Sequence, residues 1–266
     1  MKIYYFGPEG SYTEKAALKF AELINLKIAP AESIYSVFRK VERGNYGVVP
    51  TENSIEGSVT LTLDLLLRFP VKIFGETSLE IKHALLGYDL STIQVVLSHP
   101  QALAQCREFI QRMGWKVRET RSTAEAAKIV AESRDPTLAA IGSKEAGKRY
   151  GLKVLAENIQ DYPNNKTRFI LIGREDMENP LGNRTPQKGA IFLELENVPG
   201  ALYRALGVFA KRGVNLTRIE SRPSLKDLGY YVFYIDYEYT PDEEEILEEL
   251  KQVSKFLKHL GRYYVI

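Results

Sequence analysis

The chain of 266 residues contains a single cysteine, Cys106, so it cannot form an internal disulfide. Disulfides are typical of oxidising compartments, and a lone cysteine fits a reducing one. The sequence also lacks the run of about 18 apolar residues that a membrane-spanning helix needs, and its first residues lack the apolar run of a signal peptide. We therefore expect a cytoplasmic protein with no membrane association.

Excess charge of either sign is also missing. The chain has 36 basic and 34 acidic residues, which give a formal net charge of +2. Because the basic residues do not cluster, we expect no binding to nucleic acid or to a membrane surface. A small anionic ligand is compatible with this balance, since a local pocket need not change the net charge.

Motifs that hold common cofactors are scarce. The three histidines lie far apart and lack partners at metal-ligand spacing, so we expect no metal site. Residues 142–148 have the glycine and lysine spacing of a phosphate loop, but Arg149 occupies the position where Ser or Thr would hold magnesium. No dinucleotide fingerprint or G-x-S-x-G elbow is present. Cys106 lies within a predicted helix, which favours a buried structural residue over a nucleophile.

The first 170 residues do contain an alternation of short β-rich runs with amphipathic helical patterns. This alternation predicts an α/β fold in which helices cover parallel sheets. It restarts near Ile93, so we expect two lobes with a cleft between them. The predicted strands are 2–6, 46–49, 93–97, 115–119, 138–141 and 167–173, and the predicted helices begin at Ser11 and Ser33 and cover 57–68, 101–112, 122–132 and 143–149.

The pattern changes after residue 173. The segment EDMENPLGNRTPQ is polar and rich in Pro, Gly and Asn, which indicates an interdomain linker. It precedes a predicted strand 189–195, helix 199–212, strands 216–222 and 230–239, helix 242–260 and strand 262–266. The order β-α-β-β-α-β predicts a ferredoxin-like domain.

Short polar segments occur where predicted strands give way to helices. They are Gly7–Ser11, Thr51–Gly57, Ser98–Gln101 and Arg121–Thr123. In open parallel sheets, ligands bind beyond the carboxyl ends of the strands, where free N–H groups of helix N-termini favour anions. Each serine alone is explained as an ordinary helix cap. Several of them at one cleft would suit a small dianion.

The strand that begins Thr167-Arg168-Phe169 is a sharper candidate. Regular alternation places Thr167 and Phe169 on one face and Arg168 on the other. An arginine at the mouth of a strand can clamp a carboxylate with two hydrogen bonds. From the pattern alone, an edge-strand arginine that faces solvent is the more frequent case.

Residues 150–172, including Thr167-Arg168-Phe169, resemble the signature segment of the prephenate dehydratases. Further blocks of that family match in the same order: Gly7–Ser11, Pro50–Gly57 and His99–Leu103. In the C-terminal part, two segments resemble the motifs of the ACT regulatory domain that accompanies these enzymes. They are Gly200–Leu202, with Tyr203 where the motif usually has valine, and Leu216–Pro223.

The resemblance implies a two-lobed catalytic domain similar to periplasmic binding proteins, followed by a ferredoxin-like βαββαβ ACT domain. We expect the catalytic domain over residues 1–178, with one lobe of roughly 1–80 and 160–178 and the other of 81–159. A linker at 179–187 would lead to the ACT domain at 188–266. Because the sequence opens directly on the first strand, we expect a form without a fused chorismate mutase.

The implied reaction converts prephenate to phenylpyruvate in phenylalanine biosynthesis, with loss of carbon dioxide and the ring hydroxyl and without a cofactor. Thr167 would donate a hydrogen bond or proton toward the departing hydroxyl, and Arg168 would bind a substrate carboxylate or brace the site. Phe169 could pack on the ring or belong to the core. The other candidates for substrate binding are Asn53, Ser54, Gly57, Gln101, Ser122 and Thr123, while Glu52 and Glu56 are expected to be cap or surface groups.

ACT domains pair side by side and bind phenylalanine at their interface. The resemblance therefore implies feedback inhibition by phenylalanine and a homodimer or homotetramer. The helix N-terminus near Gly200 would suit the carboxylate of the effector, and Asn215 its backbone groups. The expected effector-binding residues are Gly200, Ala201, Leu202, Asn215, Leu216, Glu220, Ser221, Arg222 and Pro223.

Two other functions stay open at this point. Arogenate dehydratases perform the same chemistry on the aminated substrate, and the sequence does not separate the two. A non-catalytic amino-acid sensor with two lobes and an ACT domain is the alternative from another class. Retention of the whole Thr167-Arg168-Phe169 segment favours an enzyme.

Overall fold

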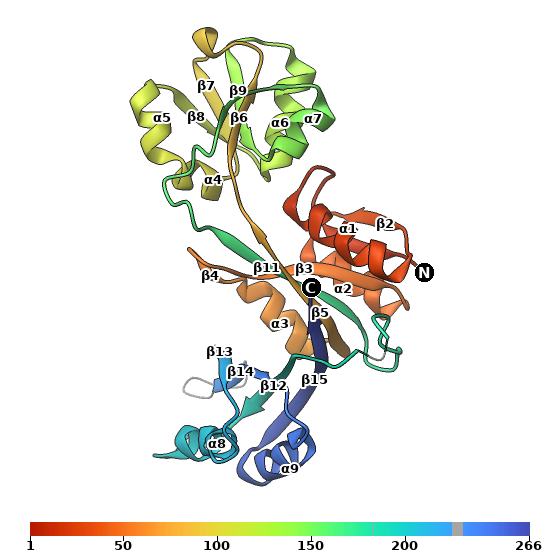
Figure 1. Cartoon of the computed structure of the whole chain (residues 1–266). Coiled ribbons are helices and arrows are strands. Elements are labelled where there is room, and N and C mark those ends of the chain that lie inside the picture. Colours follow the sequence, from red (N-terminus) through yellow and green to blue (C-terminus); the bar gives the residue numbers. More distant parts are fainter. Residues whose placement is uncertain (183, 225–230) are drawn as a thin grey trace.

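The computed structural model of the chain describes residues 1–182, 184–224 and 231–266. Three units follow one another along the long axis of the molecule (Figure 1). The N-terminal lobe (residues 1–80 and 166–174) lies between the second lobe (84–157) and the C-terminal domain (188–266). Two α/β lobes and a βαββαβ domain are the predicted fold class, which is confirmed.

The N-terminal lobe is built on a sheet with the strand order β5-β11-β3-β1-β2, and β4 pairs with β3. Helix α1 packs on one face of this sheet, and helices α2 and α3 pack on the other. Ser11 and Ser33 cap α1 and α2 as their sequence context predicts. The bounds are β1 Ile3–Phe6, α1 Tyr12–Ile24, β2 Ile28–Ala31, α2 Ile34–Glu42, β3 Tyr46–Asn53, β4 Gly57–Ser58, α3 Thr60–Arg68, β5 Val71–Glu80 and β11 Lys166–Arg174.

The second lobe has the strand order β10-β6-β9-β7-β8. Helices α4 and α5 cover one face, and α6 and α7 cover the other. The chain enters this lobe after β5 and returns to the N-terminal lobe at β11 (Figure 1), so two connections cross between the lobes. The bounds are β6 Ala84–Gly87, η1 Leu90–Thr92, β7 Val95–Ser98, α4 Pro100–Gln105, α5 Arg107–Met113, β8 Lys116–Glu119, α6 Thr123–Ser133, β9 Leu138–Gly142, α7 Lys144–Tyr150 and β10 Lys153–Glu157.

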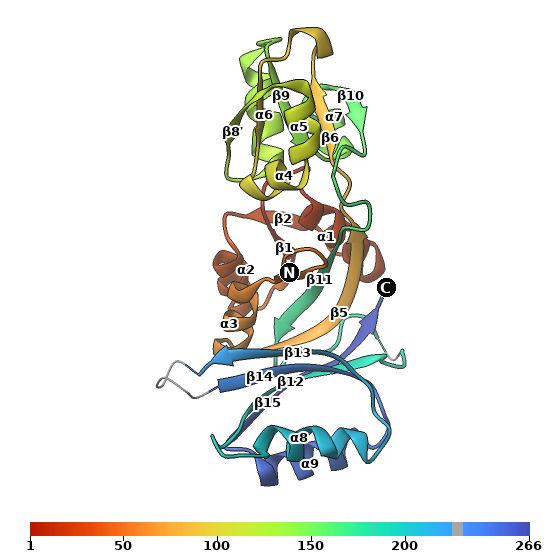
Figure 2. The same ribbon diagram turned by 90° about the vertical axis from the view of Figure 1, so that its left-hand side faces the viewer.

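The C-terminal domain has the strand order β13-β14-β12-β15. Helices α8 and α9 lie on the face that points away from the rest of the molecule (Figure 2). The opposite face buries Phe192, Tyr234 and Tyr263 in one core with the α3 residues Leu63 and Leu66. The bounds are β12 Lys188–Glu194, α8 Ala201–Ala210, β13 Leu216–Pro223, β14 Tyr231–Glu238, α9 Glu243–Val253 and β15 Phe256–Val265.

The C-terminal domain is joined to the N-terminal lobe by more than side chains. The last residues of β15 pair in parallel with β5, which merges both sheets into one of ten strands. The segment predicted as an interdomain linker also packs: Leu181 is buried against the N-terminal lobe, and Tyr264 donates to the carbonyl of Gly182 at 2.8 Å. Asn183, within that segment, lies outside the described residues.

The predicted α9 was too long. The periodicity extends the helix to residue 260, but α9 ends at Val253, and residues from Phe256 onward form β15. Ser254 has an extended backbone, and Leu257, Lys258 and His259 pair with β12. Apolar spacing that fits a helix also fits a strand here, and pairing with β12 decides between them. Tyr230, the first residue of the predicted strand 230–239, is not described.

Other differences are local. Strands β2, β5, β6 and β10 were not predicted, and the two sheets are mixed rather than purely parallel. The helix predicted from Gly57 begins at Thr60, because Gly57 has a φ of +82° and pairs with Asn53 instead. The helix predicted over 101–112 breaks at the buried Cys106 into α4 and α5.

No helix within the described residues has the length and apolar character needed to cross a bilayer.

Candidate active site

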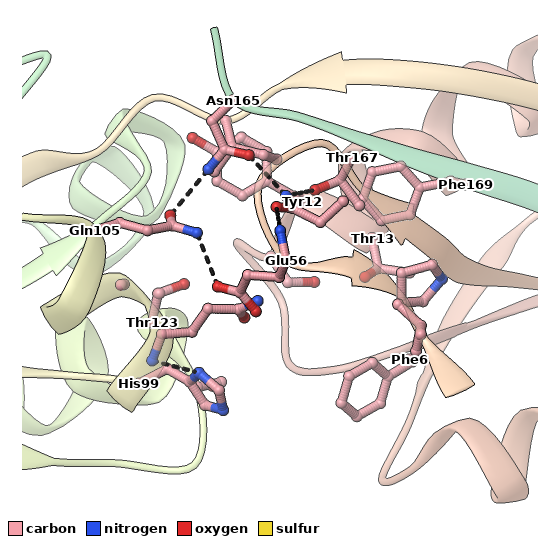
Figure 3. Close-up of a pocket in the computed structure, with 18 of the residues that line it drawn as sticks. Phe6, Tyr12, Thr13, Glu56, His99, Gln105, Thr123, Asn165, Thr167 and Phe169 are labelled. Carbon is pink, nitrogen blue, oxygen red and sulfur yellow. Dashed lines mark hydrogen bonds between the residues drawn. The ribbon is translucent and has the colours of Figure 1, made fainter. Parts of the chain in front are cut away.

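A cavity of about 540 Å³ opens between the N-terminal lobe and the second lobe (Figure 3). Its size falls in the range of ordinary small-molecule sites. The N-terminal lobe contributes the end of β1, the start of α1, the β3–β4 hairpin and the start of β11, and the second lobe contributes the starts of α4 and α6. Of the predicted substrate-site residues, those that line the cavity are Asn53, Gly57, Gln101, Ser122, Thr123, Thr167 and Phe169.

Ser54 does not line the cavity and has a bracing contact instead. Its hydroxyl donates to the carbonyl of Asn164 at 3.1 Å and accepts from the N–H of Lys166 at 2.9 Å. Both contacts hold the β3–β4 hairpin against the start of β11.

Arg168 also lies outside the cavity, on the opposite face of β11 from Thr167 and Phe169. The alternation predicted from the sequence is therefore correct. The expected direct contact with a substrate carboxylate does not fit this placement, because the guanidinium faces Asp236 of the C-terminal domain at 3.1 Å.

The position of Thr167 is fixed through Asn53. The side-chain oxygen of Asn53 accepts from the backbone N–H groups of Ile55 and Glu56 at 3.0 and 3.2 Å. Backbone N–H groups can only donate, so the amide nitrogen of Asn53 must point the other way. It donates to Oδ1 of Asn165 at 2.7 Å and to the hydroxyl oxygen of Thr167 at 2.8 Å.

This arrangement sets the direction of the Thr167 hydroxyl. The two N–H groups of the Asn53 amide are both used, one on Asn165 and one on Thr167. Because Thr167 accepts from Asn53, the proton of its own hydroxyl is free to point elsewhere. Thr167 lines the cavity, so this proton can be donated to a group bound there.

The hydrogen-bond chain continues across the cavity into the second lobe (Figure 3). The Asn165 amide donates to Oε1 of Gln105 at 2.9 Å, and the Gln105 amide donates to the Glu56 carboxylate at 3.0 Å. Nε2 of His83 lies 2.8 Å from Oε1 of Gln105. That oxygen can only accept, so Nε2 of His83 carries the proton.

Burial shifts the pKa of the two titratable groups in this hydrogen-bond chain, His83 and Glu56. His83 is 3% exposed, and among the described residues its Nδ1 has no hydrogen-bond partner. Burial therefore lowers the pKa of His83 and keeps the ring neutral. Burial also raises the pKa of Glu56, while the hydrogen bond from Gln105 acts in the opposite direction.

Four residues of this hydrogen-bond chain were not assigned to the site from the sequence. Asn165 belongs to the segment that precedes Thr167, and Gln105 lies one helical turn after Gln101, so both carried a weak signal. His83 carried none, because it precedes a strand that was not predicted. Glu56 was interpreted as a cap or surface group, whereas it lines the cavity and accepts from Gln105.

Two helix N-termini lie at the cavity. Helices α1 and α6 begin at its rim, where Ser11 and Ser122 accept from the N–H groups of Glu14 and Glu125 at 3.2 and 3.0 Å. Helix N-termini favour anions. Arg121 also lines the cavity, but its side chain is 92% exposed and pairs with Glu125. The described residues contain no group of three or more His, Cys, Asp or Glu side chains that could hold a metal ion.

The residues expected to bind an effector lie in different parts of the C-terminal domain. Ala201 and Leu202 line a pocket of about 130 Å³ at the start of α8, and Gly200 caps this helix with a φ of +79°. Arg222 instead contacts Asp64 of α3 at 3.0 Å, and the Asn215 amide donates to Glu238 at 3.2 Å. Glu220 accepts from Ser58 at 2.7 Å, Ser221 and Pro223 are exposed, and Leu216 packs on the core of the domain.

Comparison with known proteins covers the whole chain. The family model "Prephenate dehydratase" matches residues 3–177, and the model "ACT domain" matches residues 189–255. A prephenate dehydratase of Methanocaldococcus jannaschii is 53% identical over 267 residues, which cover 99% of this chain and 98% of that relative.

Solved structures are also similar over nearly the whole chain. The structure of prephenate dehydratase from Arthrobacter aurescens in complex with L-Phe is 33% identical, with a TM-score of 0.88 over 99% of this chain and 90% of that one. A structure described as a novel type of quorum-quenching acylase is 29% identical, with a TM-score of 0.88 over 100% of this chain and 98% of that one.

Proposed function

Since the chain belongs to the prephenate dehydratase family, we propose that it converts prephenate to phenylpyruvate, carbon dioxide and water. One observation of the cavity carries this proposal. The Thr167 hydroxyl accepts a hydrogen bond from Asn53 and lines the space between the lobes, so its own proton is available to a group bound there.

The chemistry needs little more than such a donor. As the ring carboxylate leaves as carbon dioxide, the electron pair of the broken C–C bond enters the ring, and the hydroxyl leaves with its bonding electrons. The departing oxygen gains negative charge and takes up a proton to become water. A donor positioned in advance stabilises that charge without reorganisation. Aromatisation of the ring favours the products.

The carboxylates of the substrate would be held by the cavity rim. The N-termini of α1 and α6 attract anions, and Gln101, Ser122 and Thr123 offer side-chain donors in the second lobe. Binding across both lobes would close them and exclude water, which strengthens the hydrogen bond from Thr167. Arg168 would contribute by bracing β11 rather than by touching substrate.

We further propose that phenylalanine inhibits the enzyme by binding at the start of α8, between two copies of the chain. The pocket of about 130 Å³ there is below the usual range for a small-molecule site, so a second subunit would complete it. Val198, Tyr203 and Ile219 are exposed apolar side chains of this domain, and β13 is an edge of its sheet. A homodimer or homotetramer through this edge would cover them. A cytoplasmic location fits the single buried thiol, Cys106.

The test is an assay with prephenate, with and without millimolar phenylalanine. We expect formation of phenylpyruvate and its suppression by phenylalanine, together with sedimentation as a dimer or larger. Arogenate as a parallel substrate separates the two dehydratase activities. No turnover of either substrate by the folded protein would contradict the proposal.

The similarity to a quorum-quenching acylase raises amide hydrolysis as a second candidate. A hydroxyl nucleophile needs a base that accepts its proton. Thr167 has the opposite neighbour, because the Asn53 amide donates to it. The geometry therefore favours a hydrogen-bond donor over a nucleophile, and release of acid from an acylated amine would be the result that reverses this preference.

A further inference from the structure

The two faces of β11 contact different parts of the molecule. Thr167 and Phe169 line the cavity, while Arg168 points to the C-terminal domain and its side chain is 19% exposed. Nη1 of Arg168 donates to Oδ2 of Asp236 on β14 at 3.1 Å, and the side chain of Asp236 is 1% exposed. Arg168, the neighbour of Thr167, is thus joined by a largely buried ion pair to the sheet β13-β14-β12-β15 of the C-terminal domain, called the regulatory sheet below.

Asp236 is held in place from its other side. Its Oδ1 accepts from the hydroxyls of Tyr234 and Tyr263 at 2.6 and 3.0 Å. Burial raises the pKa of Asp236, while the Tyr234 hydrogen bond and the Arg168 charge act in the opposite direction. Both carboxylate oxygens have donors, as a buried charge requires.

The ion pair belongs to a larger charged cluster between the N-terminal lobe and the C-terminal domain. Arg168 also lies 3.3 Å from Glu52 on β3 and 3.5 Å from Glu76 on β5. Lys188 on β12 donates to Glu76 at 2.9 Å. Each of the strands β3, β5 and β11 therefore contributes a charged group that faces the regulatory sheet.

A second connection reaches the β3–β4 hairpin. Arg218 on β13 is 8% exposed and donates to the hydroxyl and carbonyl of Thr51 at 3.0 and 3.2 Å and to the hydroxyl of Ser58 at 2.6 Å. Glu220, two residues along the same face of β13, accepts from Ser58 at 2.7 Å. Arg222 continues this face with its contact to Asp64 on α3.

Both connections end next to Asn53 and Thr167, whose hydrogen bond sets the direction of the Thr167 hydroxyl. Thr167 and Asn53 are register partners on β11 and β3. Arg168 follows Thr167 directly, and Thr51 lies two residues before Asn53 on the same strand. A displacement of β13 and β14 relative to the N-terminal lobe would therefore act on both ends of the Asn53–Thr167 hydrogen bond, which weakens steeply when its geometry is lost.

We propose that Arg168 and Arg218 are positioning residues through which phenylalanine bound to the C-terminal domain changes the placement of Thr167. The proposal rests on the function proposed above. The strand β13, which carries Arg218, also carries the Glu220–Pro223 segment expected to respond to the effector. Inhibition then acts on the donor itself.

The test uses Asp236→Asn in the full chain. Asparagine retains an oxygen acceptor for Tyr234 and Tyr263 but removes the charge opposite Arg168. The matched control is Glu249→Gln, which removes the acid of another arginine pair in the same domain, Arg212–Glu249 at 2.7 Å, on α9 and away from the N-terminal lobe. Activity is measured with and without saturating phenylalanine, and hydrogen exchange is measured in β3 and β11.

We define the inhibition ratio as the activity without phenylalanine divided by the activity with saturating phenylalanine. In Asp236→Asn we expect this ratio to fall at least about fivefold. Basal kcat should fall while KM for prephenate stays within about twofold, because the Thr167 hydrogen bond is used in the transition state. Phenylalanine should change exchange of β3 and β11 amides in the wild type but not in Asp236→Asn. The control should keep the wild-type inhibition ratio and exchange response.

Thr51→Val keeps the test decisive if Asp236→Asn does not fold. It removes one acceptor of Arg218 and should lower the inhibition ratio by a smaller factor. A folded variant of either kind with the wild-type ratio overturns the proposal, as does a wild type whose β3 and β11 exchange ignores phenylalanine. Because exchange is read without turnover, an enzyme that lacks prephenate activity but shows the exchange response would contradict only the proposed reaction.

Discussion

The N-terminal lobe meets its two neighbours through different kinds of contact. In the buried part of the cleft, it meets the second lobe through amides, with Gln105 bound to Asn165 and Glu56. The Lys15–Glu145 ion pair between these lobes is about half exposed. Toward the C-terminal domain, it has buried ion pairs and a shared apolar core.

This difference indicates which parts move together. A hydrogen bond between neutral groups contributes about 0.5–1.5 kcal/mol net, one to a carboxylate such as that of Glu56 about 1.5–3 kcal/mol, and an exposed ion pair about 0–1 kcal/mol. Loss of one partner from a buried ion pair leaves an uncompensated buried charge and costs about 3–5 kcal/mol. We infer that the second lobe closes on the N-terminal lobe while the N-terminal lobe and the C-terminal domain stay joined, so that an effector shifts β13 and β14 only within that contact.

The largest effect should come from breaking the cavity side of β11 alone. Thr167→Val removes the hydroxyl and keeps the shape, so kcat should fall about 10²–10³-fold. Steady-state kinetics with prephenate measures it. Thr167→Ser, which restores the hydroxyl, should recover most of the rate, and a near wild-type kcat for Thr167→Val would exclude the donor role.

The next effect tests the amide contacts between the lobes. Gln105→Leu removes the acceptor of Asn165 and His83 and the donor to Glu56, which leaves buried polar groups unpaired at a cost of about 1–3 kcal/mol. We expect kcat/KM to fall about 5- to 150-fold. The control is Gln111→Leu at an exposed position of α5 in the same lobe, for which kcat/KM should not change. Equal effects in both variants would argue against a special role for Gln105.

The third prediction sharpens the comparison from the other interface. Lys258 of β15 donates to three carbonyls at the end of α3, those of Leu66, Leu67 and Phe69, at 2.7, 3.2 and 2.5 Å. Burial lowers the pKa of Lys258 to about 8, so the side chain is charged at pH 7.

Replacement of Lys258 by Met should lower the free energy of unfolding by about 1–3 kcal/mol at pH 7, because three buried carbonyls lose a donor. Denaturant titration measures this loss. Lys211→Met at an exposed position of the same domain is the control and should cost less than about 0.5 kcal/mol. If the two variants unfold alike, the cap on α3 does not stabilise the interface.

The smallest effect is the pH dependence due to His83. Its pKa is lowered in the folded state, so below the ordinary value of 6.5 the unfolded chain binds more protons than the folded one. The contribution of neutral His83 to the free energy of unfolding is therefore complete above pH 6.5. As the pH falls toward the folded pKa, this contribution is lost, and the free energy of unfolding decreases by at most about 1.4 kcal/mol per pH unit.

His83→Gln keeps a donor for Gln105 and removes this titration. The difference in unfolding free energy between the wild type and His83→Gln should therefore shrink, or turn against the wild type, between pH 6.5 and 5. Denaturant titrations at several pH values measure it. A constant difference over that range would mean that the folded and unfolded proteins have the same His83 pKa.

Much of the site could be predicted because it follows local rules. The serine caps at Ser11 and Ser122 and the alternation at Thr167-Arg168-Phe169 depend on residues within one turn or one strand. Those rules placed Thr167 and Phe169 on one face and Arg168 on the other, as the structure does. They do not say which neighbour each face meets, so the sequence left open whether Arg168 faces solvent, binds a substrate carboxylate or braces the site, and it did not predict the contact with Asp236.

The sequence by itself determined the fold class, the family and the strand that carries Thr167, because periodicity and motifs are properties of neighbouring residues. Only the tertiary structure decided that His83, Gln105 and Asn165 form one chain of hydrogen bonds, and that β15 replaces the end of the predicted helix. The hydrogen-bond chain joins residues up to 82 positions apart, from His83 to Asn165. A contact between such distant segments depends on how whole sheets pack, and a local pattern contains no information about that packing.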